Sequence, residues 1–271
     1  MTSMGLRCIG ICKSAPLTSK WWPKHLRSSH HAARPFHSRG DAAAAAGGQP
    51  QNDKPILVSI EGNIGAGKTT LLSGLRTACP EWIFIEEPVG LWGTFRDEQG
   101  RSLLELFYAD RRRWSYTFQN CALLTRFQNI EAAIANAPPL TDGTQRVFVS
   151  ERCLDTDYQV FTKMLHREGS MDAMEFGLYE RWFQELQASA TPLDGVVWLR
   201  TPPDECAARI NSRGRKGEDG ITLSYLRALE AQQRQWLSNG DIPCAMVQDT
   251  GDVGVQEVRR FVESMQAGEL L

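Results

Sequence analysis

The sequence has no long hydrophobic run among its 271 residues. No stretch approaches the roughly 18 consecutive apolar residues that identify a transmembrane helix, which excludes that class of membrane protein. Metal-binding spacings are also scarce, because the seven cysteines form no Cys-x-x-Cys pair and four of the five histidines lie in the first 40 residues. These absences argue against a zinc ribbon or a small disulfide scaffold, and they predict reduced thiols.

Acidic residues are missing from residues 1–40, which contain seven Lys or Arg and six Ser. A basic, serine-bearing N-terminus without acid is typical of a transit peptide, and Arg34-Pro-Phe-His-Ser38 fits a site cut by a matrix protease. We therefore expect import into the mitochondrial matrix, with a plastid or cytosolic location as the less favoured alternatives. Residues 41–54, which are rich in Ala and Gly, are expected to form a flexible linker.

The rest of the chain is acidic, since all 32 Asp and Glu residues follow residue 40. Proteins that bind nucleic acid need a basic surface to neutralise phosphates, so no nucleic acid is expected as a partner, and no membrane either. Hydrophobic residues make up 42% of the sequence, an ordinary value for a globular protein. We expect one sizeable domain over residues 55–271.

The alternation of apolar patterns in this domain predicts an α/β fold. Short apolar runs rich in β-branched residues predict strands at 55–61, 82–86, 146–151, 195–200 and 242–247. Helical patterns separate them at 69–78, 103–137, 156–168, 171–189, 203–213, 223–238 and 253–266. Together they predict a parallel sheet with helices on both faces, in which ligands bind at the carboxyl ends of the strands.

The first of these strand ends carries a phosphate-binding loop. Residues 62–69 match the pattern G-x-x-x-x-G-K-[ST], whose backbone N–H groups bind phosphate oxygens. The lysine of this pattern reaches the terminal phosphates and the Ser or Thr hydroxyl meets Mg²⁺, so we expect ATP or GTP to bind here. The residues predicted to hold the nucleotide are Gly62, Asn63, Ile64, Gly65, Ala66, Gly67, Lys68, Thr69 and Thr70.

Two glutamates, Glu86 and Glu87, end the second predicted strand. A carboxylate in this place can accept the proton of an attacking hydroxyl, which is the general-base role in phosphoryl transfer. The spacing by itself allows a pair of surface glutamates equally well.

Five motifs in the same order resemble the deoxyribonucleoside kinase family, which includes deoxycytidine, deoxyguanosine and mitochondrial thymidine kinases. They are residues 62–69, Glu87-Pro-Val89 with Trp92, Arg113-Trp-Ser-Tyr-Thr-Phe-Gln119, Glu151-Arg152 and Arg209-Ile-Asn-Ser-Arg213-Gly-Arg215. The resemblance covers about residues 55–250. It implies a P-loop kinase with a five-stranded parallel sheet, usually a homodimer packed through helices, that moves the γ-phosphate of ATP to the 5′-hydroxyl of a deoxynucleoside with Mg²⁺.

The resemblance also assigns roles at the phosphate end of the site. Glu87 is expected to be the general base, and Arg152 to stabilise the charge that develops on the transferred phosphoryl group. Thr69 and Glu151 are the expected residues of the Mg²⁺ shell. A lid within residues 209–220, with Arg209, Arg213 and Arg215, is expected to close over the triphosphate.

At the substrate end, the resemblance implies that Trp92 and Phe118 contact the base and that the amide of Gln119 pairs with the base edge. It implies that Tyr108 and Glu218 hold the 3′-hydroxyl of the sugar. The full set expected to bind the deoxynucleoside is Glu87, Trp92, Tyr108, Phe118, Gln119, Arg126, Arg152, Asp157 and Glu218.

Arg126 and Asp157 bear on the choice of base. In the resemblance, deoxycytidine and deoxyguanosine kinases carry Arg and Asp at these positions, whereas thymidine-preferring members carry apolar or small residues. Because a charged pair leaves less room for the thymine methyl group, deoxycytidine or a purine deoxynucleoside is favoured. The segment between Trp92 and Leu103 is short, as in the thymidine-preferring and multisubstrate members. Cys153 and Tyr158 stand where the family pattern has Ser and Arg. A thymidine-preferring or multisubstrate kinase is therefore the alternative.

Two other functions are weighed against this one. A nucleoside monophosphate kinase needs basic residues to bind the phosphate of its acceptor. The Glu87-Pro-Val89 element argues against this function, because it provides a carboxylate base suited to a hydroxyl acceptor. A respiratory complex I accessory subunit resembles the same family but is not catalytic. Such a subunit does not need to keep Lys68, Glu87 and Arg152 together, and this sequence has all three.

Overall fold

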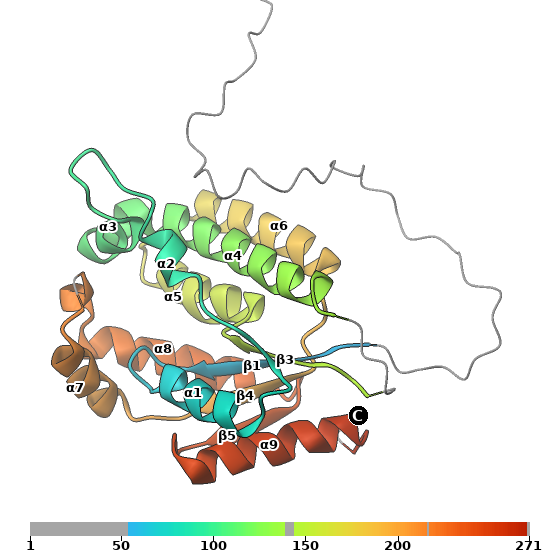
Figure 1. The fold of residues 1–271 in the computed structure, drawn as a ribbon. Helices are drawn as coiled ribbons and strands as arrows, with labels where there is room; N and C mark the ends of the chain where they lie inside the picture. Colours follow the sequence, from blue (N-terminus) through green and yellow to red (C-terminus); the bar gives the residue numbers. More distant parts are fainter. Residues whose placement is uncertain (1–53, 139–143, 216, 270–271) are drawn as a thin grey trace, which may run out of the picture. The chain divides into compact units, whose positions relative to one another are not determined.

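The computed structural model describes residues 54–138, 144–215 and 217–269. The transit peptide predicted at 1–40, and all but the last residue of the linker predicted at 41–54, lie outside the described residues and stay predictions. Within the described ranges, no helix combines the length and the apolar character needed to cross a membrane. The five predicted strands are present and pair in parallel, which confirms the α/β class (Figure 1).

The central strand of the sheet is the one that carries the phosphate loop. The strands are β1 (Ile56–Gly62), β2 (Ile83–Ile85), β3 (Val147–Glu151), β4 (Gly195–Leu199) and β5 (Cys244–Val247), in the order β2-β3-β1-β4-β5. Ile60 of β1 lies opposite Glu151 of β3, and Gly62 lies opposite Leu199 of β4. The chain changes its winding direction at β1, and such a switch point opens a crevice above the strand ends.

Helices cover both faces of this sheet. They are α1 (Lys68–Ala78), α2 (Val89–Trp92), α3 (Leu103–Ala109), α4 (Arg111–Ala135), α5 (Lys163–Arg167), α6 (Ala173–Ser189), α7 (Pro203–Arg213), α8 (Leu223–Leu237) and α9 (Asp252–Gln266). On one face, Val58 and Ile60 pack with residues of α1 and α9. On the other face, Leu57 packs with Ile130 of α4. Figure 1 shows α1 and α9 below the sheet and α4 and α6 above it.

The long helical pattern predicted at 103–137 divides into α3 and α4 at Asp110. The Asp110 carboxylate accepts a hydrogen bond from the Arg113 backbone N–H at 3.1 Å, which caps the start of α4. The fifth strand starts at Cys244, two residues later than predicted, because Pro243 has no N–H to give to the sheet. The short helix α2, which carries Trp92 toward the site, was not predicted.

The segment predicted as one α-helix at 156–168 is helical but of two kinds. A π-helix, η2, spans Thr156–Thr162, and α5 follows it. Two consecutive residues of η2 reach buried charged partners, since Thr156 donates to Glu61 and Asp157 pairs with Arg126. Wider π-type turns occur frequently at functional sites, and this one lies directly after β3 at the site described next.

Candidate active site

A cavity of about 670 Å³ lies at the carboxyl ends of β1, β2 and β3. Its lining brings together most of the predicted site residues, namely Ile64, Gly65, Gly67, Lys68, Thr69, Thr70, Glu87, Trp92, Tyr108, Phe118, Gln119, Arg126, Glu151, Arg152, Asp157, Arg209, Arg213, Arg215 and Glu218. Gly62, Asn63 and Ala66 do not line it. Residues more than 150 positions apart in the chain therefore share one cavity, as the arrangement of strand ends predicts.

The phosphate loop owes its shape to glycines and to hydrogen bonds behind it. A Cβ atom on Gly62 would lie 2.7 Å from the Leu199 carbonyl oxygen, so only glycine fits there. Asn63 donates through Nδ2 to the Leu226 carbonyl at 2.8 Å, and the Ala66 carbonyl accepts from Thr201 Oγ1 at 2.9 Å. The three residues that do not line the cavity thus hold the loop in place, and the first N–H groups of α1 remain open to an anion.

Lys68 points its ammonium group into the loop. Its Nζ atom donates to the Asn63 carbonyl at 3.1 Å and lies 3.7 Å from Glu151 Oε1. Burial, followed by the positive charge of Arg152, lowers the pKa of Lys68 to about 8. A bound triphosphate would add negative charge beside this buried ammonium group and favour its charged form.

The two residues predicted to hold Mg²⁺ lie next to each other. Thr69 Oγ1 donates to Glu151 Oε2 at 3.4 Å, so a hydroxyl and a carboxylate oxygen face one position at the end of β3. Both are hard oxygen ligands of the kind Mg²⁺ prefers. In residues 54–138, 144–215 and 217–269, no group of three or more His, Cys, Asp or Glu could hold a metal.

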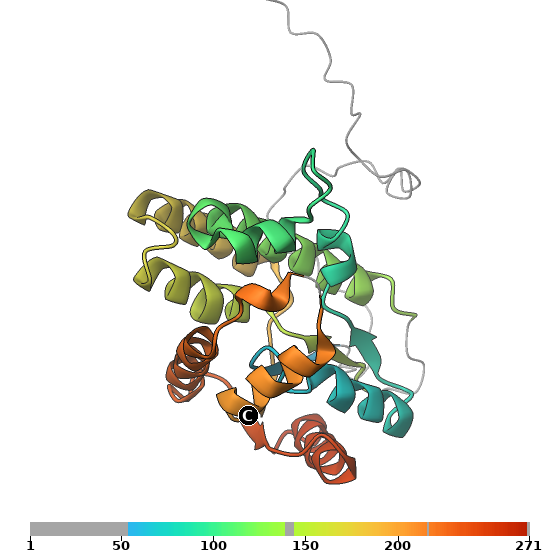
Figure 2. The same ribbon diagram turned by 90° about the vertical axis from the view of Figure 1, so that its left-hand side faces the viewer.

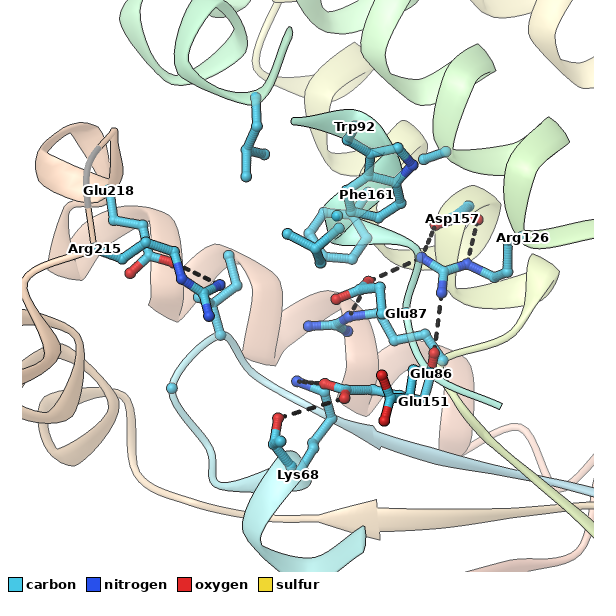
Figure 3. A pocket seen from close by; sticks show the side chains of 18 of the residues that line it. Lys68, Glu86, Glu87, Trp92, Arg126, Glu151, Asp157, Phe161, Arg215 and Glu218 are labelled. Atoms are coloured by element: carbon cyan, nitrogen blue, oxygen red, sulfur yellow. Dashed lines mark hydrogen bonds and ion pairs between the residues drawn. The ribbon is translucent and has the colours of Figure 1, made fainter. Parts of the chain in front are cut away.

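Glu87 lies between two arginines, as Figure 3 shows for Arg126. Its Oε1 atom is 2.9 Å from Arg126 Nη2 and 3.3 Å from Arg152 Nε. Burial by itself would raise the pKa of Glu87, but the charges of Arg126, Arg152 and Lys68 outweigh it and hold the pKa below its ordinary value. The carboxylate is therefore ionised and able to accept a proton. Its neighbour Glu86 lines the same cavity but is largely exposed, and it pairs with Arg76 at 2.9 Å.

Arg126 joins residues from three segments of the cavity lining. Its guanidinium group holds Asp157 through two hydrogen bonds, Nε to Oδ2 at 2.8 Å and Nη2 to Oδ1 at 3.2 Å. The third nitrogen, Nη1, donates to the Glu151 carbonyl at 3.0 Å. Burial would lower the pKa of Arg126, but Asp157 and Glu87 raise it above its ordinary value, so the group stays charged. One side chain therefore contacts three of the predicted site residues.

Aromatic rings form one wall of the cavity. Trp92 and Phe118 meet edge to face with their ring centroids 5.2 Å apart, and Phe107 stacks on Phe118 at 4.7 Å. Beside them Gln119 is only 1% exposed, and its Oε1 atom has no hydrogen-bond partner. A buried amide oxygen without a donor is costly, and a ligand with an N–H donor at its edge would satisfy it.

Two of the three arginines in the predicted lid, Arg213 and Arg215, donate hydrogen bonds to Glu218. Glu218, at the start of the 3₁₀ helix η3 (Glu218–Gly220), accepts hydrogen bonds from Arg213 at 2.7 and 2.8 Å and from Arg215 at 3.5 Å. Burial, followed by the charge of Glu218, raises the pKa of Tyr108, the predicted partner of Glu218. Arg209 donates instead to the Ala66 carbonyl at 2.8 Å. Figure 2 shows the orange segment between α7 and α8 reaching toward α3.

Phe107 and Phe161 are among the lining residues that were not predicted from the sequence, and the backbone conformation of Arg152 was not foreseen. Phe161 lies under the guanidinium group of Arg152, whose carbon is 4.9 Å from the ring centroid, and Phe107 stands behind Phe118. Arg152 has a φ of 66°, and among the described residues it is the one non-glycine residue with a positive φ. Phe161 lies four residues after Asp157, so the helical spacing could have indicated a shared face. Strained backbone of this kind clusters at functional sites.

Comparison with known proteins decides the family. Residues 58–266 match the model of the family described as deoxynucleoside kinase. This chain belongs to the deoxynucleoside kinase family. It is 33% identical over 195 residues to a deoxycytidine kinase of Bos taurus, covering 66% of this chain and 74% of that protein. It is 36% identical to deoxycytidine kinase 2 of Gallus gallus, covering 66% and 73%.

A third deoxynucleoside kinase among these relatives is a mitochondrial deoxyguanosine kinase of Xenopus laevis. It is 33% identical over 195 residues, which cover 67% of this chain and 72% of that protein. The family predicted from the five motifs is thus confirmed, and with it an enzyme that phosphorylates deoxynucleosides. The family implies ATP as the phosphate donor, which agrees with the phosphate loop at β1.

Proposed function

We propose that this deoxynucleoside kinase transfers the γ-phosphate of ATP to the 5′-hydroxyl of deoxycytidine or a purine deoxynucleoside, with Mg²⁺ as its cofactor. One observation carries the proposal: Arg126 binds Asp157 on the base side and Glu87 on the phosphate side of the same cavity. A base and a 5′-hydroxyl are the two ends of a nucleoside. The hydrogen-bonded network of Asp157, Arg126 and Glu87 would therefore lie along a bound nucleoside from its base to its 5′-hydroxyl.

The proposed reaction follows from the charges at the strand ends. The N–H groups of the loop and Lys68 bind the phosphates of ATP, while Glu87 accepts the proton of the 5′-hydroxyl as its oxygen attacks. Arg152 lies 3.3 Å from Glu87 and can stabilise charge on the phosphoryl group during transfer. Thr69 and Glu151 would hold Mg²⁺, which would neutralise negative charge on the phosphates.

The base preference is supported by buried polar groups rather than by the family alone. Arg126 and Asp157 are 3% and 2% exposed, and a charged pair at this depth is retained only where its hydrogen bonds are made. Gln119 adds an unpaired acceptor beside them. Cytosine, adenine and guanine each carry an exocyclic amino group and no methyl group, whereas thymine carries a methyl group and no amino group. Relatives named deoxycytidine and deoxyguanosine kinases agree with this preference.

A turnover panel tests the proposal directly. The full chain is given Mg-ATP with deoxycytidine, deoxyguanosine, deoxyadenosine or thymidine, with ribonucleosides and thymidine monophosphate as controls. We expect 5′-phosphorylation of deoxynucleosides, with thymidine the poorest of the four. Turnover of the monophosphate alone would identify a nucleoside monophosphate kinase. No turnover by folded protein that binds ATP would point to a structural role.

The Glu218→Gln variant tests the proposed contact with the sugar. We expect its KM for the deoxynucleoside to rise at least about tenfold, because a hydrogen bond to a charged group contributes roughly 1.5–3 kcal/mol. A 2′,3′-dideoxynucleoside lacks the hydroxyl group and serves as the control substrate. Wild type and variant should bind that compound alike. An unchanged KM for the ordinary substrate would contradict the assignment of Glu218.

We also propose that the enzyme is a homodimer. Three apolar side chains of α6, Met174, Leu178 and Trp182, follow one another at a spacing of four and are 73%, 46% and 54% exposed. Leu124 of the neighbouring helix α4 is 46% exposed as well. Large exposed apolar residues at helical spacing form a stripe that water solvates poorly, and a second copy of the same stripe would cover it.

Trp182→Glu should convert this dimer to a monomer, because it places a charge in the middle of the stripe. The measurement is the molar mass from light scattering during size-exclusion chromatography. Phe95→Glu is the matched control, since Phe95 is 44% exposed but lies outside α4 and α6. The control should keep the mass of the wild type. A wild-type monomer, or a dimeric Trp182→Glu variant, would contradict the proposed interface.

The proposed location is the mitochondrial matrix, which rests on the basic, acid-free residues 1–40. One relative carries the word mitochondrial in its name, which supports the same location. Residues 1–40 fused to a fluorescent protein should carry it into mitochondria. A diffuse or plastid signal would contradict this.

A further inference from the structure

Glu61 is a buried carboxylate that the reaction proposed above does not use. It is the last residue of β1 before Gly62 and is 0% exposed, and it does not line the cavity. The other residues of β1 before it, apart from Ser59, are apolar. Removing a carboxylate from water costs several kcal/mol unless partners compensate it, so this position calls for a physical explanation.

The two oxygens of Glu61 have different surroundings. Oε1 accepts hydrogen bonds from two hydroxyl groups, those of Ser59 and Thr156. Oε2 accepts none, although it is buried. Within the described part of the chain, the ion pair of Glu61 is with Arg152, whose Nη1 atom lies 3.8 Å from Oε2. That nitrogen is also buried without a hydrogen-bond partner.

Arg152 is therefore held from several sides. Its backbone N–H donates to the Ile60 carbonyl at 3.2 Å, which ties it to the residue before Glu61. Its Nε atom faces Glu87 inside the cavity, Nη1 faces Glu61 behind the cavity, and the ring of Phe161 lies against the guanidinium plane. A residue with a strained φ of 66° keeps this conformation only where its surroundings impose it.

We propose that Glu61 is a positioning residue for phosphoryl transfer and acts through Arg152. The hydroxyl groups of Ser59 and Thr156 fix the rotation of the carboxylate, so that Oε2 is directed at Nη1. The negative charge behind the guanidinium group then keeps Arg152 in line with Glu87. The Glu61 carboxylate also compensates the positive charge of Arg152 while Glu87 accepts the proton of the 5′-hydroxyl.

This inference rests on the role proposed for Arg152 in phosphoryl transfer, so the experiment measures both residues. The full chain is compared with Glu61→Gln, Arg152→Ala and the double variant, and kcat and KM are measured for deoxynucleoside and ATP. Glutamine still accepts hydrogen bonds but carries no charge. We expect Glu61→Gln to lower kcat by about tenfold to a hundredfold, as small misplacements of catalytic groups do, with KM nearly unchanged.

The double variant separates positioning from folding. If Glu61 acts through Arg152, the double variant should be no slower than Arg152→Ala, because the group to be positioned is already gone. Losses that multiply in the double variant, or a wild-type kcat for Glu61→Gln, would overturn the inference while leaving the role of Arg152 intact. A wild-type kcat for Arg152→Ala would overturn both.

A second pair of variants covers the case in which Glu61→Gln does not fold. Ser59 and Ser150 lie opposite each other on β1 and β3, and both are buried. Ser59 donates to Glu61, whereas the hydroxyl of Ser150 has no partner. Ser59→Ala should lower kcat, and the loss should disappear in the Arg152→Ala background. Ser150→Ala should match the wild type. Equal kcat values for the two serine variants would overturn the inference.

Discussion

Replacement of Glu87 by glutamine is expected to lower kcat about a thousandfold, within the range that general bases contribute. Glutamine keeps the shape of the side chain but cannot take the proton of the 5′-hydroxyl. The low pKa of Glu87, held down by Arg126, Arg152 and Lys68 against burial, means that the wild-type carboxylate is ionised at neutral pH. The KM for the deoxynucleoside should change only modestly, since the loss concerns the transition state.

The neighbouring glutamate provides the matched control. Glu86 also follows β2, but its side chain is 73% exposed and pairs with Arg76. Glu86→Gln should therefore keep the wild-type kcat. Steady-state kinetics with saturating Mg-ATP measures both variants, and ATP affinity checks that each is folded. Glu87→Gln with wild-type turnover would remove Glu87 as the base.

Combined replacement of Arg126 by methionine and Asp157 by alanine is expected to raise the preference for thymidine over deoxycytidine about a hundredfold or more in kcat/KM. The change removes a buried charged pair that is joined by two hydrogen bonds, and it opens space for the thymine methyl group. Both residues are replaced together, because removing one partner would leave an uncompensated buried charge.

The ratio of kcat/KM values is the proper measurement for this variant. Arg126 also donates to Glu87 at 2.9 Å, so its loss should slow the reaction with every substrate. The control replaces an exposed pair in the same way: Arg101→Met with Asp97→Ala removes an ion pair of 2.7 Å outside the cavity. The control should rank substrates as the wild type does. An unaltered ranking in the Arg126 and Asp157 variant would contradict the assignment of the base site.

The strands and helices were predicted well wherever a local sequence pattern specifies them. All five strands and the helix at 203–213 follow from apolar runs and helical spacing. The errors lie at boundaries that local hydrogen bonds decide, such as the Asp110 cap between α3 and α4 and the missing N–H of Pro243. The π-helix η2 was not foreseen, because nothing in the spacing distinguishes it from an α-helix.

The sequence by itself determined the phosphate loop and the family, because eight consecutive residues form the loop and the other motifs are short and local. Only the tertiary structure decided which of Glu86 and Glu87 pairs with Arg126 and Arg152, since the two lie side by side in the chain. It also decided that Glu218 holds Arg213 and Arg215, and that Glu61 stands behind Arg152. The pairings within the cavity join segments far apart in the chain, such as Thr69 and Glu151, which are 82 positions apart. The direction of a buried side chain depends on which distant partner packing brings within a few ångströms, and no local pattern encodes that.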